Sequence, residues 1–180
     1  MSSIIKAYQR ILMKHPTKIQ ALQTGVLMGL GDTVAQTLIE KKKYKEYDFM
    51  RTARFFGIGV FIAGPGLKSW YGFLDKHIAK RKTGTTAVLK KVFVDQAVFA
   101  PNFLACFVVL LGALEMKPWT SIREKLERDY LDILITNYKV WPAVQIVNFY
   151  FMPLQYQVLF VQLVALFWNT YLSWKTNMPV

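Results

Sequence analysis

Apolar residues dominate five stretches of this chain, and polar residues and prolines separate them. A helix of about 20 predominantly apolar residues is long enough to cross the hydrocarbon core of a bilayer. The stretches predict helices over Thr17–Ile39, Phe49–Leu74, Ala87–Leu114, Leu131–Met152 and Leu154–Trp174. We therefore predict an all-α fold, a polytopic membrane bundle of four to five long helices in a single domain over residues 1–180.

The N-terminal segment, from Ser2 to Lys18, has a different pattern and contains no acidic residue. Its apolar residues recur on one side of a helix, and Lys6 and Arg10 lie opposite. We expect this amphipathic N-terminal helix to lie on the membrane surface and to end at Pro16, which has no backbone N–H to donate. Acid-poor basic segments of this kind are typical of mitochondrial import signals.

Glycines and prolines mark places where the predicted helices approach each other or bend. Gly25 and Gly29 are four residues apart, a spacing that lets a second helix come close. A proline in a helix leaves a carbonyl without its intrahelical partner, so it predicts an interruption or a bend. We expect these at Gly64 with Pro65, at Pro101, at Pro142 and at Pro153. The last two prolines leave open whether the fourth and fifth helices cross completely.

Polar residues inside the apolar stretches are the main functional signal. A carboxylate at the centre of a membrane helix costs roughly 2.5 to 3.5 kcal/mol on insertion scales, so it usually faces protein, a cavity or a permeation path. Two interpretations stay open for Asp32 and Asp95: each pairs with a cation or a helix N-terminus and fixes packing, or each lines a polar pathway. For Gln145 and Asn148 the alternative is interhelical hydrogen bonding. The candidate pore-lining or gating residues are Asp32, Gln36, Asp95, Gln96, Trp141, Gln145 and Asn148.

The composition supports a membrane protein, because hydrophobic residues make up 53% and charged residues only 19% of the chain, against about 25% charged in soluble domains. The formal net charge is +12, and the 23 Lys and Arg residues gather where the apolar stretches end. There they can meet anionic headgroups. The sequence has no zinc-ligand set, RNP motif or basic zipper, so the expected partners are membrane lipids and not nucleic acid. The cations on the two predicted membrane faces tie in number, which leaves the orientation open.

Catalytic chemistry has no support in the sequence, which lacks a nucleophile elbow, a phosphate-binding loop and a cluster of metal ligands. We therefore expect no enzyme activity, no metal and no cofactor. Cys106 is the only cysteine, so no intramolecular disulfide forms, and we expect its thiol to be buried among apolar residues. Association into a homo-oligomer stays open.

Several linked motifs resemble one family of membrane proteins. They are the run Met28-Gly-Leu-Gly-Asp-Thr-Val-Ala-Gln36, Gly64-Pro65 with Trp70-Tyr71 and Leu74, Asp95-Gln96 with Pro101, Trp141-Pro142 through Asn148-Phe149 to Pro153, and Trp168-Asn169 with Tyr171-Leu172-Ser173-Trp174. In this order they resemble the Mpv-seventeen (Mpv17) family of mitochondrial and peroxisomal membrane proteins over nearly the whole chain. The Arg128-Asp-Tyr run and the Ser173-Trp-Lys175 ending are closer to the mitochondrial members.

The resemblance implies a protein of the mitochondrial inner membrane, with the peroxisomal membrane as the alternative. It also implies about four crossings and a channel or small-solute pore that affects membrane potential, metabolite balance and mitochondrial DNA maintenance. The chain departs from the family pattern at Gln157, where a basic residue is common, and this leaves the selectivity open. A non-conducting structural or lipid-binding membrane protein is the first rival, and an intramembrane enzyme is the second.

Overall fold

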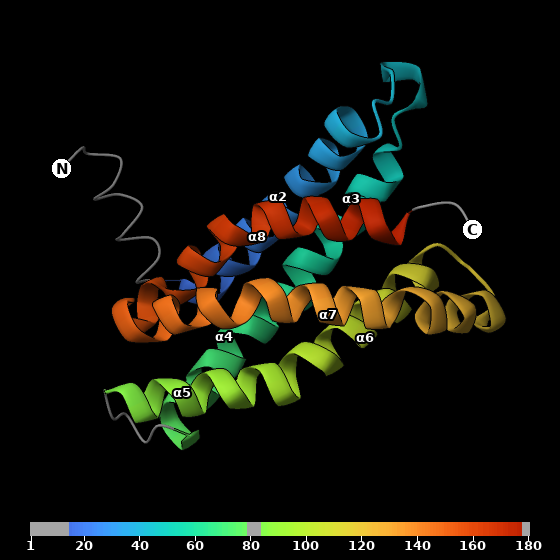
Figure 1. The fold of residues 1–180 in the computed structure, drawn as a ribbon. Helices are drawn as coiled ribbons and strands as arrows, with labels where there is room; N and C mark the ends of the chain where they lie inside the picture. The colour runs from blue at the N-terminus through green and yellow to red at the C-terminus, as the bar shows by residue number, and fades with distance from the viewer. Residues whose placement is uncertain (1–14, 79–83, 178–180) are drawn as a thin grey trace, which may run out of the picture.

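The computed structural model describes residues 15–78 and 84–177, and the regular secondary structure in these ranges is helical throughout. The predicted all-α fold is therefore confirmed for the described part of the chain. Five long helices follow one another, and each runs antiparallel to the helix before it (Figure 1). The predicted N-terminal surface helix falls mainly on residues 1–14, which lie outside the described ranges.

The first long helix consists of α2 (Pro16–Val34) and a π-helical turn, η1 (Ala35–Ile39). Pro16 suits the first turn, because its missing N–H has no intrahelical partner there. The helix ends before Lys41, which adopts a left-handed conformation with φ 53°. The chain then passes through a short 3-10 turn, η2 (Tyr44–Glu46).

The second long helix contains α3 (Phe49–Ile58), η3 (Gly59–Ala63), α4 (Gly64–Phe73) and η4 (Leu74–Ile78). Asp48 caps its N-terminus by accepting a hydrogen bond from the backbone N–H of Arg51 at 2.9 Å. Of the interruption or bend predicted at Gly64 and Pro65, the interruption is wrong, since the chain stays helical from η3 into α4. The π turn η3 lies just before Pro65, and a wider turn gives the proline ring room beside the preceding carbonyls.

The third long helix contains α5 (Thr85–Val94), η5 (Asp95–Phe99) and α6 (Ala100–Leu114). A π turn again comes directly before a proline, here Pro101. Among the described residues, Thr85–Leu114 is the one helix that is long and apolar enough to cross a membrane by length and composition.

The fourth helix, α7 (Trp119–Phe151), has 33 residues. It begins before the predicted start at Leu131, so the charged residues of segment 119–130 and the predicted apolar stretch form one helix. Of the break or bend predicted at Pro142, the break is wrong, because the α-helix continues through it. Pro153 does separate α7 from the last helix, α8 (Leu154–Thr176). Its fixed φ and missing N–H suit the N-cap position, which it occupies.

Glycines bring the backbones of the first two helices together. A Cβ added to Gly59 would lie 2.5 Å from the Cα of Gly25, and one added to Gly64 would lie 2.5 Å from the Cα of Ala21. Real Cβ atoms do not come this close, so only glycine permits these crossings. Gly29 has ordinary contacts only, since its added Cβ would lie 3.6 Å from the Cβ of Phe56.

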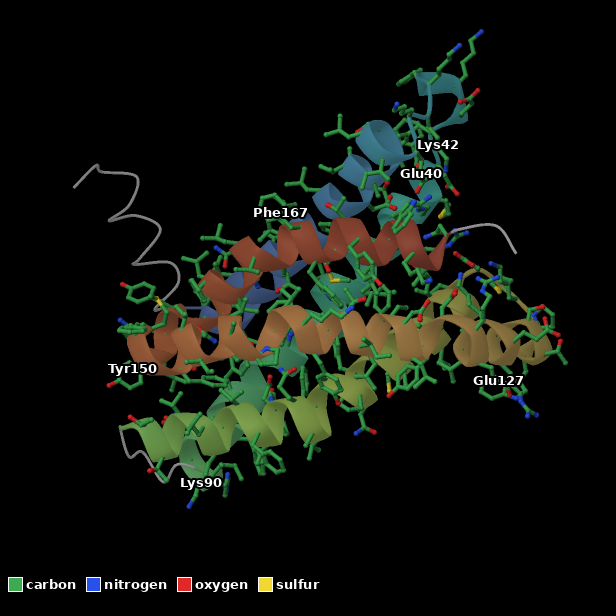
Figure 2. All side chains as sticks on the ribbon, in the orientation of Figure 1. Glu40, Lys42, Lys90, Glu127, Tyr150 and Phe167 are labelled. Carbon is green, nitrogen blue, oxygen red and sulfur yellow. The ribbon has the colours of Figure 1, made fainter. Side chains whose placement is uncertain are left out.

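The molecule exposes many large apolar side chains, and it buries polar side chains beside an apolar core. Large apolar side chains are exposed on all five helices, including Phe61, Phe93 and Phe167, which are 79%, 73% and 77% exposed. Figure 2 shows Phe167 pointing away from the bundle, and it also shows that Glu40 and Tyr150 lie at opposite ends of the molecule. Cys106 is exposed, so its predicted burial is wrong. Many of the buried polar residues gather in two places, which are described next.

Candidate functional site

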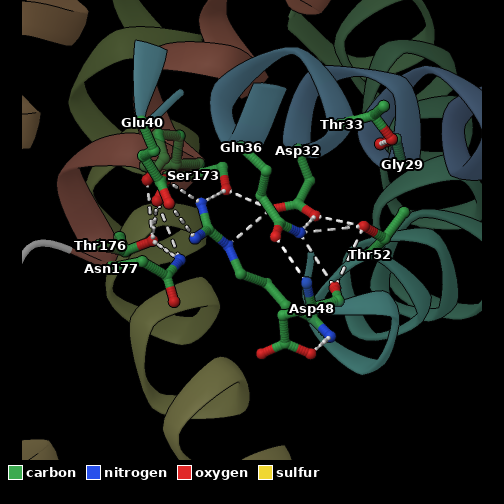
Figure 3. Close-up of polar contacts among 12 residues, drawn as sticks. Gly29, Asp32, Thr33, Gln36, Glu40, Asp48, Thr52, Ser173, Thr176 and Asn177 are labelled. Carbon is green, nitrogen blue, oxygen red and sulfur yellow. Dashed lines mark hydrogen bonds and ion pairs between the residues drawn. The ribbon is translucent and has the colours of Figure 1, made fainter. Parts of the chain in front are cut away.

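A cluster of charged and polar side chains closes one end of the bundle, where α2 ends and α3 begins (Figure 3). We call it the Arg51 cluster; it comprises Asp32, Gln36, Glu40, Asp48, Arg51, Thr52 and Ser173. The Nε atom of Arg51 lies 2.6 Å from Oδ1 of Asp32. Its terminal nitrogens donate to Glu40 at 2.9 and 2.6 Å. Arg51 is 3% exposed and Asp32 is fully buried, so this is a buried ion-pair network.

Neutral groups complete the bonding of Asp32. The hydroxyl of Ser173, from α8, donates to Oδ1 at 2.5 Å, and the hydroxyl of Thr52 donates to Oδ2 at 2.5 Å. Gln36 donates to the same Oδ2 at 2.9 Å. The Gln36 amide also pairs with the backbone of Asp48, donating to its carbonyl at 2.9 Å and accepting from its N–H at 2.8 Å. Asp32 and Gln36 therefore hold α2, α3 and α8 together at this end.

Two acids of the Arg51 cluster pair with the guanidinium, Asp32 and Glu40, and Glu40 is the more exposed of the two. Partial burial of the Glu40 carboxyl raises its pKa. Hydrogen bonds from Arg51 and Lys42, with the charges of these two residues, lower the pKa by more than burial raises it. The pKa therefore lies below its ordinary value of 4.5, and Glu40 is ionised near neutral pH.

A cavity of about 90 Å³ lies inside the bundle, and all five helices contribute to its walls. Its lining is largely apolar, with Leu, Phe, Ala and Met side chains. We call it the central cavity. Its polar lining residues are Thr24, Tyr71, Asp95, Gln96, Asn137, Gln145, Gln162 and Asn169, accompanied by the indoles of Trp141 and Trp168. A cavity of this size has room for a few water molecules, on the order of one per 30 Å³.

Among the described residues that line the central cavity, Asp95 is the one acid, and it is 2% exposed. Its carboxylate accepts from the indole Nε1 of Trp70 at 2.8 Å, from Gln96 at 2.8 Å and from Gln145 at 3.1 Å. No ion pair joins it to a Lys or Arg within residues 15–78 and 84–177. Neutral donors alone therefore stabilise this charge, in contrast to Asp32.

Two chains of amides extend outward from Asp95. Asn148 donates to Oε1 of Gln145 at 3.0 Å, and Asn137 donates to Oε1 of Gln96 at 3.0 Å. Because a carboxylate only accepts, each amide turns its NH₂ group toward Asp95 and its carbonyl away from it. The chain through Gln145 ends at Oδ1 of Asn148, a buried acceptor without a donor among the described residues. Both ends of this chain, the carboxylate of Asp95 and Oδ1 of Asn148, are therefore hydrogen-bond acceptors.

The backbone contributes to this geometry, because Asp95 is the first residue of η5. A π turn inside an α-helix widens the helix locally, and such turns are frequent at functional sites. Tyr71 approaches from α4, where its hydroxyl accepts from Gln145 at 2.9 Å. Three helices thus meet around one carboxylate.

The structure separates the candidate pore-lining residues into two groups. Asp95, Gln96, Trp141 and Gln145 line the central cavity. Asn148 lies behind Gln145 and contacts it by a hydrogen bond. Asp32 and Gln36 belong to the Arg51 cluster and are absent from the described lining of the cavity.

Sequence reasoning did not place Trp70, Tyr71 and Asn137 among the candidate site residues, although they lie near Asp95. A signal for Asn137 was present, because residues 137, 141, 145 and 148 recur at helical spacing and share one face of α7. No comparable signal existed for the indole of Trp70, which comes from another helix. Among the described residues, no group of three His, Cys, Asp or Glu side chains is arranged to hold a metal ion.

Comparison with known proteins gives full-length similarities. A model of the Mpv17 / PMP22 family matches residues 112–173. The mitochondrial inner membrane protein Mpv17 of Homo sapiens is 48% identical over 174 residues, which cover 96% of this chain and 97% of that protein. The Xenopus laevis protein of the same name is 46% identical over 177 residues, 98% of this chain and 99% of that protein. Protein sym-1 of Neurospora crassa is 38% identical over 167 residues, 93% and 95% of the two chains. No solved structure matches the chain.

Proposed function

Since this chain belongs to the Mpv17 / PMP22 family and is a protein of the mitochondrial inner membrane, we propose that it is a channel or small-solute pore in that membrane. The proposed pathway passes through the central cavity, and Asp95 is its principal charged group. We include in the proposal that about four of the long helices cross the bilayer, with the crossing of the last helix left open. Such a pore would act on membrane potential and metabolite balance, and we extend the proposal to the link with mitochondrial DNA maintenance that the family resemblance implies.

The distribution of exposed and buried side chains supports several crossings. Leu22, Phe61, Phe93, Ile135 and Phe167 come from five different long helices, and each is at least 50% exposed. A protein surrounded by water would expose far less contiguous apolar surface. A bilayer removes this cost, because lipid tails are as apolar as the side chains that face them.

The hydrogen bonding of Asp95 is the main observation that supports a pore. A carboxylate kept only for packing would be expected to have a cation beside it, as Asp32 has Arg51. Asp95 instead has three neutral donors and a cavity at its side. A fixed negative charge in a polar pathway attracts cations and repels anions. We therefore propose selectivity for cations or for solutes with hydrogen-bond donors.

Reconstitution of the purified protein in vesicles of defined composition tests this function. We expect current under a salt gradient, with a reversal potential on the cation-selective side. Asp95→Asn keeps the shape of the side chain and removes its charge, so the reversal potential should move toward zero. Asp132→Asn is the control, because Asp132 is an exposed acid that pairs with Lys175 at 2.9 Å away from the cavity. Unchanged selectivity in folded Asp95→Asn protein would contradict the proposed role of Asp95.

The small volume and largely apolar lining of the central cavity favour a second candidate, a non-conducting structural or lipid-binding protein. The same vesicles distinguish the two. Absence of current and solute efflux, together with lipid retained in stoichiometric amount after purification, would favour this alternative. We propose no catalytic step for the protein, and turnover of a lipid or metabolite by the purified protein would contradict that proposal.

A further inference from the structure

Aromatic side chains form much of the wall of the central cavity. Four of the five long helices contribute rings to it, which are those of Tyr71, Phe99, Phe103, Phe107, Trp141 and Trp168. The ring centroids of Trp141 and Trp168 lie 6.0 Å apart, with the ring planes inclined by 82°. The face of an aromatic ring is negative and attracts cations. The wall therefore favours a cation even where it has no hydrogen-bond acceptor.

The carboxylate of Asp95, which belongs to the same lining, has room for one further donor. Among the described residues, Oδ1 accepts from Trp70 alone, whereas Oδ2 accepts from both Gln96 and Gln145. An ionised carboxylate has about four lone-pair sites, so these three donors leave one site on Oδ1 unused. A ligand with a single N–H donor would complete the set.

A bare metal cation suits this arrangement poorly. Potassium filters replace the hydration shell of the ion with rings of carbonyl oxygens. In the central cavity, Gln96 and Gln145 turn their NH₂ groups toward Asp95. Their side-chain oxygens already accept from Asn137 and Asn148. A dehydrated metal ion would therefore meet N–H groups beside the carboxylate and apolar side chains elsewhere.

An alkylated ammonium ion suits the same walls better. Its alkyl groups are stabilised by the apolar lining, and only its N–H groups need acceptors. An engineered cavity of about 150 Å³ in another protein binds benzene, so in proportion the central cavity of about 90 Å³ has room for roughly four non-hydrogen atoms. Trimethylammonium has this size, with three methyl groups and one N–H. It therefore matches the volume, the apolar wall and the single open site of Asp95.

We propose that the central cavity binds small alkylated ammonium ions that keep one N–H, of the size of trimethylammonium, in preference to potassium or sodium. The N–H donates to Asp95, and the methyl groups contact the aromatic wall. This inference rests on the proposed pore for the route by which the cation reaches the cavity, and it narrows the proposed selectivity to organic cations. Binding itself does not depend on conduction.

Isothermal titration of the purified protein in detergent with the chloride salts of methylated ammonium ions tests the site. The affinity should rise about fourfold with each methyl group from methylammonium to trimethylammonium, the gain from burying one such group. Tetramethylammonium should bind at least about threefold more weakly than trimethylammonium, because it loses a charge-assisted hydrogen bond that contributes about tenfold and gains only one methyl group. An affinity that still rises at tetramethylammonium would overturn the proposed role of the N–H.

Competition with a metal cation tests the preference for an organic one. A tenfold excess of potassium chloride should change the affinity for trimethylammonium by less than twofold. Displacement of trimethylammonium by an equal concentration of potassium, or absence of binding across the methylated series, would overturn the proposal. Both measurements use the unmodified chain, so they decide the question even where a substitution prevents folding.

Two pairs of variants localise the binding. Asp95→Asn should weaken the binding of trimethylammonium at least about tenfold, because the charged acceptor is lost. Asp132→Asn should leave it unchanged, since Asp132 is exposed and pairs with Lys175. Trp141→Leu should weaken binding about fivefold by removing one ring from the wall, whereas Trp119→Leu, at the exposed start of the same helix, should have no effect. Unchanged affinity in folded Asp95→Asn protein would contradict the site.

The same salts in reconstituted vesicles separate this inference from the pore. With trimethylammonium chloride on one side and potassium chloride on the other, the reversal potential should show a higher permeability for trimethylammonium. Binding in the expected order in detergent, without current in vesicles, would support the site and contradict the pore. Current that does not distinguish the two cations, without binding in detergent, would support the pore and contradict the site.

Discussion

The Nε atom of Arg51 lies 2.6 Å from Oδ1 of Asp32, and this contact joins α3 to α2 at one end of the bundle. Ser173 of α8 donates to the same oxygen at 2.5 Å and accepts from Arg51 at 2.7 Å. Three helices are therefore tied by one guanidinium. Removing either partner of such a pair is strongly destabilising, because the other charge then stays buried without a counter-charge.

Arg51→Met should destabilise the protein strongly, because it leaves the buried carboxylate of Asp32 without a cation, although Glu40 keeps Lys42 at 3.0 Å. Removing one partner of a buried pair costs about 3 to 5 kcal/mol. Denaturant unfolding in detergent measures the change. Arg123→Met is the control, because Arg123 forms an exposed pair with Glu127 and its loss should change stability by less than about 1 kcal/mol. Similar stability of Arg51→Met and wild type would show that the pair is unimportant.

Acid should weaken the same end of the bundle through Glu40. Its pKa is lower in the folded protein than its ordinary value of 4.5. The unfolded chain therefore binds the proton more tightly, so the contribution of Glu40 is fully present above about pH 4.5 and is lost as the pH falls through the folded pKa. Thermal unfolding from pH 3 to 7 should show a smaller acid-induced loss for Glu40→Gln than for wild type. Identical pH profiles would rule out this role for Glu40.

The first two long helices cross at Gly25 and Gly59, and we expect that neither glycine can be replaced by a residue with a side chain without loss of stability. Gly59→Ala places a Cβ where the Cα of Gly25 would be 2.5 Å away, so backbones must separate. Overpacking of this kind costs typically about 1 to 3 kcal/mol. Gly57→Ala is the matched control, because its added Cβ meets nothing within 4 Å and alanine favours the helix by roughly 0.5 to 1 kcal/mol. Equal effects of the two substitutions on unfolding would contradict the close crossing.

The positions of the long helices could be predicted from the sequence because apolar length and proline placement are local properties. Thr17–Ile39 corresponds to α2 with η1, and Leu154–Trp174 corresponds to α8. The effect of the prolines was harder to predict. Pro65 and Pro101 follow π turns that keep the helix continuous, and this adjustment depends on neighbouring helices more than on the local sequence.

The candidate site could be predicted only as a set of polar residues inside apolar stretches. The sequence could not show which carboxylate has a cation, because Arg51 and Ser173 lie 19 and 141 positions from Asp32. It also could not show that Gln157, and not Gln155, is buried at the start of α8. Both depend on how the helices rotate against each other, which tertiary packing decides.

The hydrogen bond from the Trp70 indole to Asp95 should be strongly coupled to the charge of Asp95. The indole Nε1 lies 2.8 Å from Oδ1, and a hydrogen bond to a charged group contributes about 1.5 to 3 kcal/mol. Trp70→Phe should therefore destabilise the wild type by at least this amount, and less in an Asp95→Asn background. A double-mutant cycle of unfolding free energies isolates the difference as a coupling energy.

Asp95→Asn itself should leave the protein folded, with a change below about 3 kcal/mol, because only neutral donors are rearranged and no buried cation loses its partner. Trp119→Phe combined with Asp95→Asn is the control cycle, since Trp119 is exposed at the start of α7 and should give additive effects. Additivity within about 0.5 kcal/mol in the Trp70 cycle would show that Asp95 is not held by this bond. A coupling of the expected size, with a folded Asp95→Asn protein, would leave the Asp95 charge free to act on solutes in the central cavity, as the proposed pore requires.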